Sequence, residues 1–186
     1  MNIILIGFRC AGKTTVGNRL ARRLKKDFVD CDEYIEGKTH LTIREIFELC
    51  GESYFRMLEG DAIKELCKLD GRVIATGGGA PLRYKNIHNL KSNGIVFFLD
   101  VGPEEAAKRI VRDPKTRSRR PPLTSKDLKS EVREQVQFRR EYYLNAADFT
   151  VRTDRRGAEE VVLDIVGHLK VKGFQDPGDD RDASLA

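Results

Sequence analysis

Residues 7–14 form a pattern that binds phosphate groups. They read Gly-Phe-Arg-Cys-Ala-Gly-Lys-Thr, the Gly-x-x-x-x-Gly-Lys-Thr spacing of a phosphate-binding loop. Glycines at both ends let the backbone turn sharply, so that its amides can surround phosphate oxygens. Lys13 supplies a charge for the outer phosphates of a nucleotide, and the Thr14 hydroxyl is placed to bind Mg2+ as cofactor. The predicted ATP-binding residues of this loop are Cys10, Ala11, Gly12, Lys13, Thr14 and Thr15.

Two carboxylates, Asp30 and Asp32, lie two residues apart where a second short strand is expected to end. Phosphoryl transfer needs a metal ion at the phosphates and a group that handles the proton of the acceptor. One aspartate can reach the metal and the other the acceptor. Surface acids with this spacing are common, but their place beside a phosphate-binding loop favours the catalytic interpretation.

Arg56 and Glu59 lie three residues apart on one face of an expected helix, so they can pair. They could form a weak surface ion pair, or Glu59 could orient Arg56 toward a substrate carboxylate. The three glycines at 77–79 directly follow an expected strand at 72–76. They could form a plain turn, but three in a row favour bare backbone amides that a ligand can approach.

Apolar strands alternate with helices along the chain, which predicts an α/β fold with a parallel sheet covered on both faces. Ligands of such sheets bind at the carboxyl ends of the strands, so the three motifs should converge on one crevice. The expected strands are residues 3–6, 27–30, 72–76, 95–99 and 149–151, and the expected helices follow at 13–25, 42–50, 52–66, 81–92, 103–112, 125–145 and 159–169.

The chain of 186 residues is expected to form a single domain over 1–170, with a mobile lid at about 112–123 and a disordered tail at 171–186. Residues 108–120 hold seven basic side chains and one acidic one, a net charge of +6. The rest therefore carries −1 of the total of +5. Charge gathered in one segment fits a small polyanion rather than a nucleic acid.

The four cysteines lie far apart, which indicates reduced thiols in a cytoplasmic protein rather than zinc ligands or disulfides. The apolar runs are too short to span a membrane, and the expected first strand leaves no room for a signal peptide. We therefore expect a cytoplasmic protein without membrane partners.

Several further motifs, taken together and in order, resemble the shikimate kinase family over residues 1–169. The match consists of residues 7–15, 28–32, 46–47, 51–52, Phe55-Arg56-x-x-Glu59, 75–80, 120–123, and Arg139-x-x-x-Tyr143 before Ala147-Asp148. The resemblance implies a P-loop NTPase fold like that of nucleoside monophosphate kinases, three-layered (α/β/α), with strand order 2-3-1-4-5. It implies a monomer that uses ATP to phosphorylate the 3-hydroxyl of shikimate, in aromatic amino-acid biosynthesis.

The resemblance also implies a role for individual residues. Asp32 is the candidate base, Lys13 and the lid residue Arg120 act at the phosphates, and Thr14 and Asp30 serve Mg2+. The residues implied to bind shikimate are Asp32, Arg56, Gly77, Gly78, Gly79 and Arg139. Of the residues implied to bind ATP, Arg156 and Arg109 contact the adenine and Arg120 the phosphates.

This chain departs from the family pattern in three places. Thr14 replaces a common serine and keeps the hydroxyl, whereas Pro122 replaces a usual leucine. The lid is long and rich in arginine, so Arg117, Arg119 and Arg120 all stay candidates for the phosphate contact.

Two alternative functions remain. The first is another small-molecule kinase, such as a gluconate-type kinase, which would share the phosphate-binding loop. The second is a nucleotide-binding regulator without turnover. Arg56, Arg139 and residues 77–79 favour a cyclic hydroxy acid as acceptor, and Asp30, Asp32 and Arg120 favour an enzyme.

Overall fold

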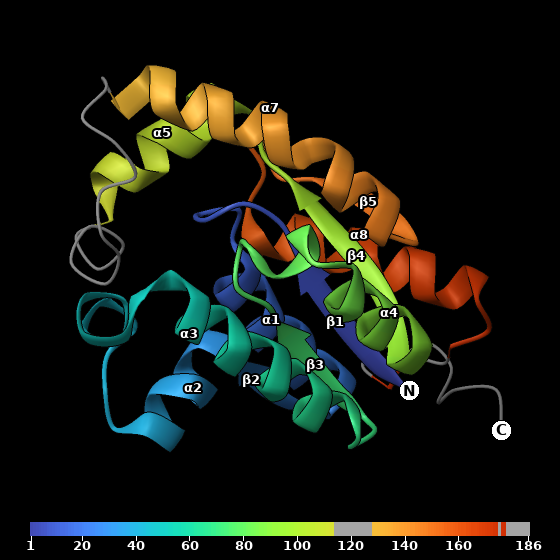
Figure 1. Ribbon diagram of the computed structural model, residues 1–186. Helices are drawn as coiled ribbons and strands as arrows, with labels where there is room; N and C mark the ends of the chain where they lie inside the picture. The colour runs from blue at the N-terminus through green and yellow to red at the C-terminus, as the bar shows by residue number, and fades with distance from the viewer. Residues whose placement is uncertain (114–127, 175, 178–186) are drawn as a thin grey trace, which may run out of the picture.

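A parallel sheet forms the centre of the molecule. The computed structural model describes residues 1–113, 128–174 and 176–177. In this part of the chain five strands pair in the order β2-β3-β1-β4-β5, as predicted (Figure 1). They are β1 (Asn2–Ile6), β2 (Asp27–Asp30), β3 (Arg72–Ala75), β4 (Gly94–Asp100) and β5 (Phe149–Arg152).

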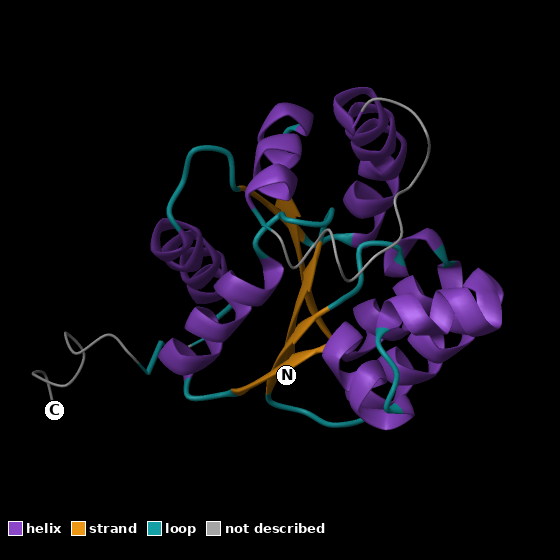
Figure 2. Cartoon of the chain, turned by 90° about the vertical axis from the view of Figure 1, so that its left-hand side faces the viewer, coloured by secondary structure: helices purple, strands orange, loops and turns teal. Residues whose placement is uncertain are grey.

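Helices cover both faces of the sheet, which gives the predicted three layers (Figures 1 and 2). Helices α1 and α8 pack on each other on one face, and α4 and α7 cover the other. Helix α3 packs beside α4, α2 packs on α3, and α5 packs on α7. Their bounds are α1 (Lys13–Leu24), α2 (Cys31–Thr39), α3 (Ile43–Cys67), α4 (Tyr84–Asn93), α5 (Pro103–Arg112), α7 (Leu128–Ala146) and α8 (Ala158–Val171). No helix among the described residues is long and apolar enough to cross a membrane.

The central strand β1 explains why the phosphate-binding loop is rigidly placed. Its residues 3–6 are fully buried because helices cover both sides of the sheet. Ile4 pairs with Ile74 of β3 on one side and with Val96 of β4 on the other. The loop that leaves β1 therefore starts from a fully buried strand at the centre of the sheet.

Helix α2 was not expected from the sequence. It begins directly after β2 because Asp30 caps it: the Asp30 carboxylate accepts a hydrogen bond from the Asp32 amide at 2.9 Å. Acidic residues in the first turn, Asp32 and Glu33, suit the positive end of the helix dipole. The strand thus turns into a helix at the very residues that carry the predicted carboxylates.

Two other boundaries differ from the expectation. The helices expected on either side of Gly51 join into α3 with a kink at this residue, whose φ of 80° lies in the region that favours glycine. The helix expected from Pro81 begins as a short 3-10 turn, η1 (Ala80–Leu82), and α4 follows it. The helix expected from Ser125 lies outside the described residues until Leu128, where α7 begins.

The chain beyond α8 is partly packed, where the composition predicted disorder from residue 171. Phe174 packs against the core, and the Asp176 side chain, 1% exposed, forms an ion pair with Arg23 of α1 at 2.9 Å. A buried carboxylate needs such a partner, and α1 supplies it. Residue 175 and residues 178–186 lie outside the described part, so the rest of the tail stays a prediction.

Candidate active site

The phosphate-binding loop (residues 7–14) curls back on itself between β1 and α1. Gly7 and Gly12 have φ angles of 145° and 99°, which side chains rarely allow. A Cβ on Gly7 would also lie 2.6 Å from the Leu99 carbonyl oxygen. The Lys13 ammonium donates to the carbonyls of Gly7 and Phe8 at 2.8 and 2.9 Å. The loop therefore has the shape, the amides and the cation that a nucleotide phosphate requires.

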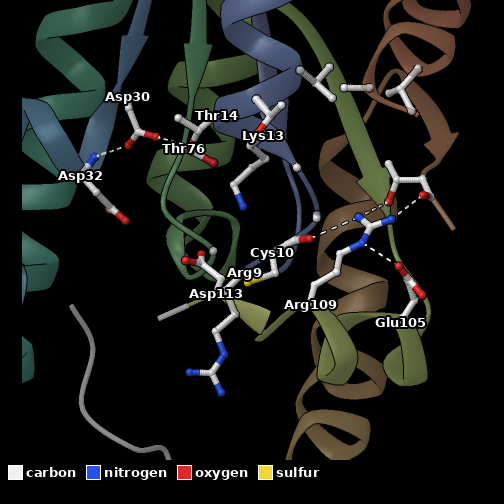
Figure 3. A pocket seen from close by; sticks show the side chains of 18 of the residues that line it. Arg9, Cys10, Lys13, Thr14, Asp30, Asp32, Thr76, Glu105, Arg109 and Asp113 are labelled. Atoms are coloured by element: carbon white, nitrogen blue, oxygen red, sulfur yellow. Dashed lines mark hydrogen bonds and ion pairs between the residues drawn. The ribbon is translucent and has the colours of Figure 1, made fainter. Parts of the chain in front are cut away.

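Thr14, Asp30 and Asp32 are linked at one wall of the site (Figure 3). The Thr14 hydroxyl donates to Asp30 at 2.8 Å, and the other Asp30 oxygen accepts from the Asp32 amide. Burial, together with the charge of Asp32, raises the pKa of Asp30 despite these hydrogen bonds. A partly buried carboxylate with a raised pKa gains from a cation nearby.

These donors fit Mg2+ in kind and number. The ion prefers oxygen ligands, and it usually takes one or two from the protein and the rest from phosphates and water. Thr14 and Asp30 supply a hydroxyl and a carboxylate beside the phosphate-binding loop. No group of three or more acidic, His or Cys side chains that could hold a metal occurs among the described residues.

The glycine loop (residues 77–79) follows β3 and touches three different neighbours. A Cβ on Gly77 would lie 2.7 Å from a Glu59 carboxylate oxygen and 2.9 Å from Asp32 Oδ1. On Gly79 it would lie 2.3 Å from Arg56 Nη1. Side chains at these positions have no space, so packing by itself accounts for glycine at 77 and 79, and the contact with a ligand stays a prediction.

Arg56 is held by two glutamates of its own helix. Its Nη1 donates to both oxygens of Glu59 at 3.0 and 3.1 Å, and its Nε and Nη2 donate to Glu52 at 3.2 and 3.0 Å. The Glu59 side chain is only 1% exposed. A buried, forked ion pair fixes the guanidinium plane, so the pair predicted from the sequence is not a weak surface contact.

Arg139 approaches the same glycine loop from α7. Its Nη1 lies 3.4 Å from the Gly78 carbonyl oxygen, which also accepts a hydrogen bond from Tyr143 at 2.6 Å. The Arg139 guanidinium lies 5.7 Å from the centre of the Phe8 ring. Arg56 and Arg139 thus reach the glycine loop from two different helices.

Arg109 and Arg156 lie at the opposite wall, near the start of α8. Arg109 donates to the carbonyls of Cys10 and Thr153, at 3.3 and 2.7 Å, and pairs with Glu105 at 2.9 Å (Figure 3). Arg156 pairs with Asp164 at 2.8 Å. This wall ties the phosphate-binding loop to the end of β5.

The four thiols differ in their access to solvent. Cys10 is half-buried and lines the cleft, and Cys50 is exposed on α3. Cys31 and Cys67 are buried, and burial raises the pKa of the Cys31 thiol well above its usual value and that of Cys67 to about 11. Neither buried thiol suits a reaction with an alkylating reagent.

A cleft of about 820 Å³ joins these parts along the carboxyl ends of the strands. The predicted residues that line it are Cys10, Ala11, Gly12, Lys13, Thr14, Thr15, Asp30, Asp32, Gly78, Arg109 and Arg156. Arg56, Gly77, Gly79 and Arg139 do not line it. Gly77 lies beside Asp32 and Arg139 contacts Gly78, both of which line the cleft, whereas Arg56 lies behind them beside Gly79. Arg120, Arg117 and Arg119 lie outside the described residues.

The cleft also contains residues that the sequence analysis did not select. They include Arg9, Glu33, Glu36, Thr76, Glu105, Arg112 and Asp113. Arg9 occupies an unspecified position of the phosphate-binding pattern, so its type carried no signal. Only its place in the folded chain marks it as a candidate.

A phosphate-binding loop beside two carboxylates, at the edge of a 2-3-1-4-5 sheet, defines a P-loop phosphotransferase with a fold like that of nucleoside monophosphate kinases. A solved structure shares this fold: a deoxyadenosine kinase from M. mycoides, 18% identical, matches 92% of this chain and 99% of its own with a TM-score of 0.61. The sequence model of the shikimate kinase family matches residues 9–170. The chain belongs to the shikimate kinase family.

Individual relatives match along nearly their whole length. Shikimate kinase of Caldanaerobacter subterraneus subsp. tengcongensis is 38% identical over 92% of this chain and 98% of its own. That of Pseudomonas syringae pv. syringae is 40% identical over 90% and 95%. A structure of shikimate kinase from Acinetobacter baumannii in complex with shikimate is 36% identical, with a TM-score of 0.86 over 94% of this chain and 95% of that one. The family and the ATP-dependent kinase class predicted from the motifs are confirmed.

Proposed function

We propose that this protein transfers the γ-phosphate of ATP to the 3-hydroxyl of shikimate, which gives shikimate 3-phosphate and ADP. Membership of the shikimate kinase family supports the reaction. The observation that carries it is the meeting of two loops at one carboxylate. Asp32 borders the phosphate-binding site, and it lies close enough to Gly77 that a Cβ there would be 2.9 Å from its Oδ1. An acceptor hydroxyl held between the loops would therefore face both a carboxylate and the phosphates.

ATP binds with its phosphates in the loop of residues 7–14. The amides from Cys10 to Thr15 and the Lys13 ammonium bind the phosphate oxygens, because the helix dipole of α1 adds to their attraction for negative charge. Arg109 and Arg156 border the adenine. Thr14 and Asp30 would hold Mg2+, which would neutralise charge on the phosphate oxygens.

The acceptor binds between Asp32 and the glycine loop. Asp32 accepts the proton of the 3-hydroxyl as general base. Arg56 and Arg139 bind the carboxylate of shikimate, and the amides of residues 77–79 line the ring. Arg120 approaches the transferred phosphoryl group from the lid.

The protein acts as a cytoplasmic monomer in this proposal. Its four scattered cysteines, two of them buried, suit a reducing compartment. The concentrated positive charge of residues 108–120 suits ATP rather than a nucleic acid or a membrane surface.

An ADP-release assay with purified protein tests the function. The acceptors are shikimate, gluconate and a mixture of nucleoside monophosphates, each with Mg-ATP and with excess EDTA. We expect ADP release that depends on shikimate and on the divalent ion. A Lys13→Met variant purified in parallel controls for contaminating kinases. Faster turnover of gluconate or of a nucleotide would overturn the proposed acceptor, and no turnover of any acceptor would overturn the enzyme.

A further inference from the structure

Arg156 lines the cleft from the loop between β5 and α8, and three acceptors hold its guanidinium. Nη1 donates to the Arg152 carbonyl at 3.2 Å and to the Asp164 carboxylate at 2.8 Å. Nη2 donates to the Glu160 carbonyl, in the first turn of α8, at 3.0 Å. Of these three acceptors only Asp164 carries a charge, so its hydrogen bond is the strongest of the set.

Asp164 is itself confined on the side away from the cleft. Its Oδ1 lies 3.6 Å from Nε2 of His168, one turn further along α8. The His168 ring stacks on Phe149 of β5 with ring centres 4.7 Å apart, and its centre lies 6.3 Å from that of the fully buried Phe97 in β4. The carboxylate therefore lies between a cation at the cleft and a side chain that packs on the sheet.

The other charges near this wall do not replace Asp164. Three nearby carboxylates each bind a group other than Arg156: Asp154 binds Arg152, Glu105 binds Arg109, and Glu160 binds the Gly157 amide. Arg112 and Asp113, at the end of α5, add one charge of each sign to the cleft. Loss of the Asp164 charge would make this wall more positive, which by charge alone favours an anionic nucleotide. A weaker nucleotide affinity after that loss would therefore have to come from geometry.

We propose that Asp164 is a positioning residue for the nucleotide, which holds the Arg156 guanidinium in place at the adenine end of the cleft. The inference rests on the proposed function, in which Arg156 borders the adenine. The two side chains are 31% and 36% exposed, and a pair this exposed adds little to the stability of the fold. Its contribution is order, because a guanidinium that is fixed beforehand loses less conformational freedom when the base binds.

Calorimetric binding of Mg-ATP and of Mg-tripolyphosphate, which lacks the nucleoside, separates position from charge. Asp164→Asn should weaken ATP binding about two- to ten-fold, the scale of ordering one long side chain on binding. It should leave tripolyphosphate binding unchanged or slightly tighter, because a negative charge has been removed. Asp164→Glu keeps the charge and should bind ATP more tightly than Asp164→Asn does. In an Arg156→Met background, Asp164→Asn should have no further effect on ATP binding.

Glu159→Gln is the matched control, because it removes a carboxylate from the same helix. Glu159 pairs with Arg19 at 3.6 Å and does not line the cleft. Both of its affinities should equal those of the wild type, and melting curves of all variants check the fold. Equal weakening of both ligands by Asp164→Asn would overturn the inference, since the phosphate site would then be disturbed as well. Unchanged or tighter ATP binding would overturn it too.

The remaining outcomes separate this inference from the proposed reaction. If Arg156→Met leaves the ATP affinity unchanged, Arg156 does not contact the nucleotide, and the role of Asp164 is overturned while the reaction stands. Turnover of shikimate is measured separately on the wild type. No turnover together with the expected ATP affinities would overturn the proposed reaction and support the role of Asp164 in nucleotide binding.

Discussion

Gly79→Ala is the substitution for which the structure predicts the most specific effect. The backbone at Gly79 has φ −98° and ψ −10°, which alanine adopts without strain. The effect is therefore steric. The new methyl group would lie 2.3 Å from Arg56 Nη1 and 2.7 Å from Arg56 Cζ. Ordinary contact begins at 3.4 Å, so the guanidinium must move by about 1 Å.

A movement of this size affects both stability and binding. Arg56 makes a forked pair with Glu59, whose side chain is 1% exposed, and the shift stretches both hydrogen bonds. We expect a loss of roughly 1–3 kcal/mol in the free energy of unfolding, the usual cost of overpacking. Misplacing a substrate-positioning group by about 1 Å can cost up to about 100-fold in rate. We expect kcat/KM for shikimate to fall 10- to 100-fold, and KM for ATP to stay near the wild-type value.

The assays are steady-state kinetics and urea unfolding on the same preparations. Gly167→Ala is the matched control, since Gly167 lies in α8 and, apart from the adjoining backbone of that helix, no atom lies within 4 Å of the added methyl group. It should leave both KM values unchanged and stabilise the protein by about 0.5–1 kcal/mol, because alanine favours a helix. Wild-type kinetics for shikimate in Gly79→Ala would refute the role of Arg56. An equal rise in KM for ATP and for shikimate would show that the whole cleft, and not the acceptor end, had been disturbed.

Four further predictions concern the other parts of the site. Asp32→Asn should lower kcat about 100-fold or more with little change in ATP binding, because it removes the proposed general base, and near-normal turnover would contradict this role. Burial and the charge of Asp32 raise the pKa of Asp30, so protonated Asp30 stabilises the fold at acid pH and this contribution is lost as the pH rises through the raised pKa. Asp30→Asn should therefore raise the Tm of the ligand-free protein at pH 8 but not at acid pH, and it should lower kcat with Mg-ATP. Alkylation of Cys10 should be slowed by Mg-ATP while the exposed Cys50 reacts at an unchanged rate, as mass spectrometry of partly labelled protein would report. Arg120→Ala should lower kcat about 100-fold or more, since an arginine at the transferred group acts mostly in the transition state. Alanine at Arg117 or Arg119 should mainly weaken ATP capture, and more so at low salt. A large loss of kcat in one of these two variants, and not in Arg120→Ala, would assign the phosphate contact to that arginine instead.

The fold was predictable from the sequence where a local pattern, such as an apolar run or a fixed motif spacing, is enough to identify the element. The buried strand β1 reads as an apolar run, and the phosphate-binding loop follows it with a fixed spacing. Helix α2 was missed because only Cys31 and Ile35 are buried in it, so its sequence has little helical periodicity. Its strongest signal is the cap at Asp30, and that residue had already been interpreted as a metal ligand. In the proposed site one carboxylate would serve both roles, and a sequence pattern does not separate a cap from a metal ligand.

The site was predictable for residues that a motif specifies and not for those that only packing specifies. Arg9 stands at an unspecified position of its pattern, and its place beside Gly78 depends on β1 and β3 being neighbours. The burial of Glu59 likewise follows from the glycine loop of β3 packing against α3. Both facts come from contacts between segments far apart in the sequence, and the local spacing of residues does not predict such contacts.

The glycine loop illustrates how these contacts constrain one another. Its three positions meet three different partners: Gly77 meets Asp32 and Glu59, Gly78 meets the phosphate-binding loop, and Gly79 meets Arg56. None of the three has a positive φ, so flexibility does not explain the choice of glycine. Close approach does, because a side chain at these positions would push Asp32, the phosphate-binding loop and Arg56 away from the glycine loop. In the proposed mechanism, the run of glycines is thus the packing condition for bringing both substrates to Asp32.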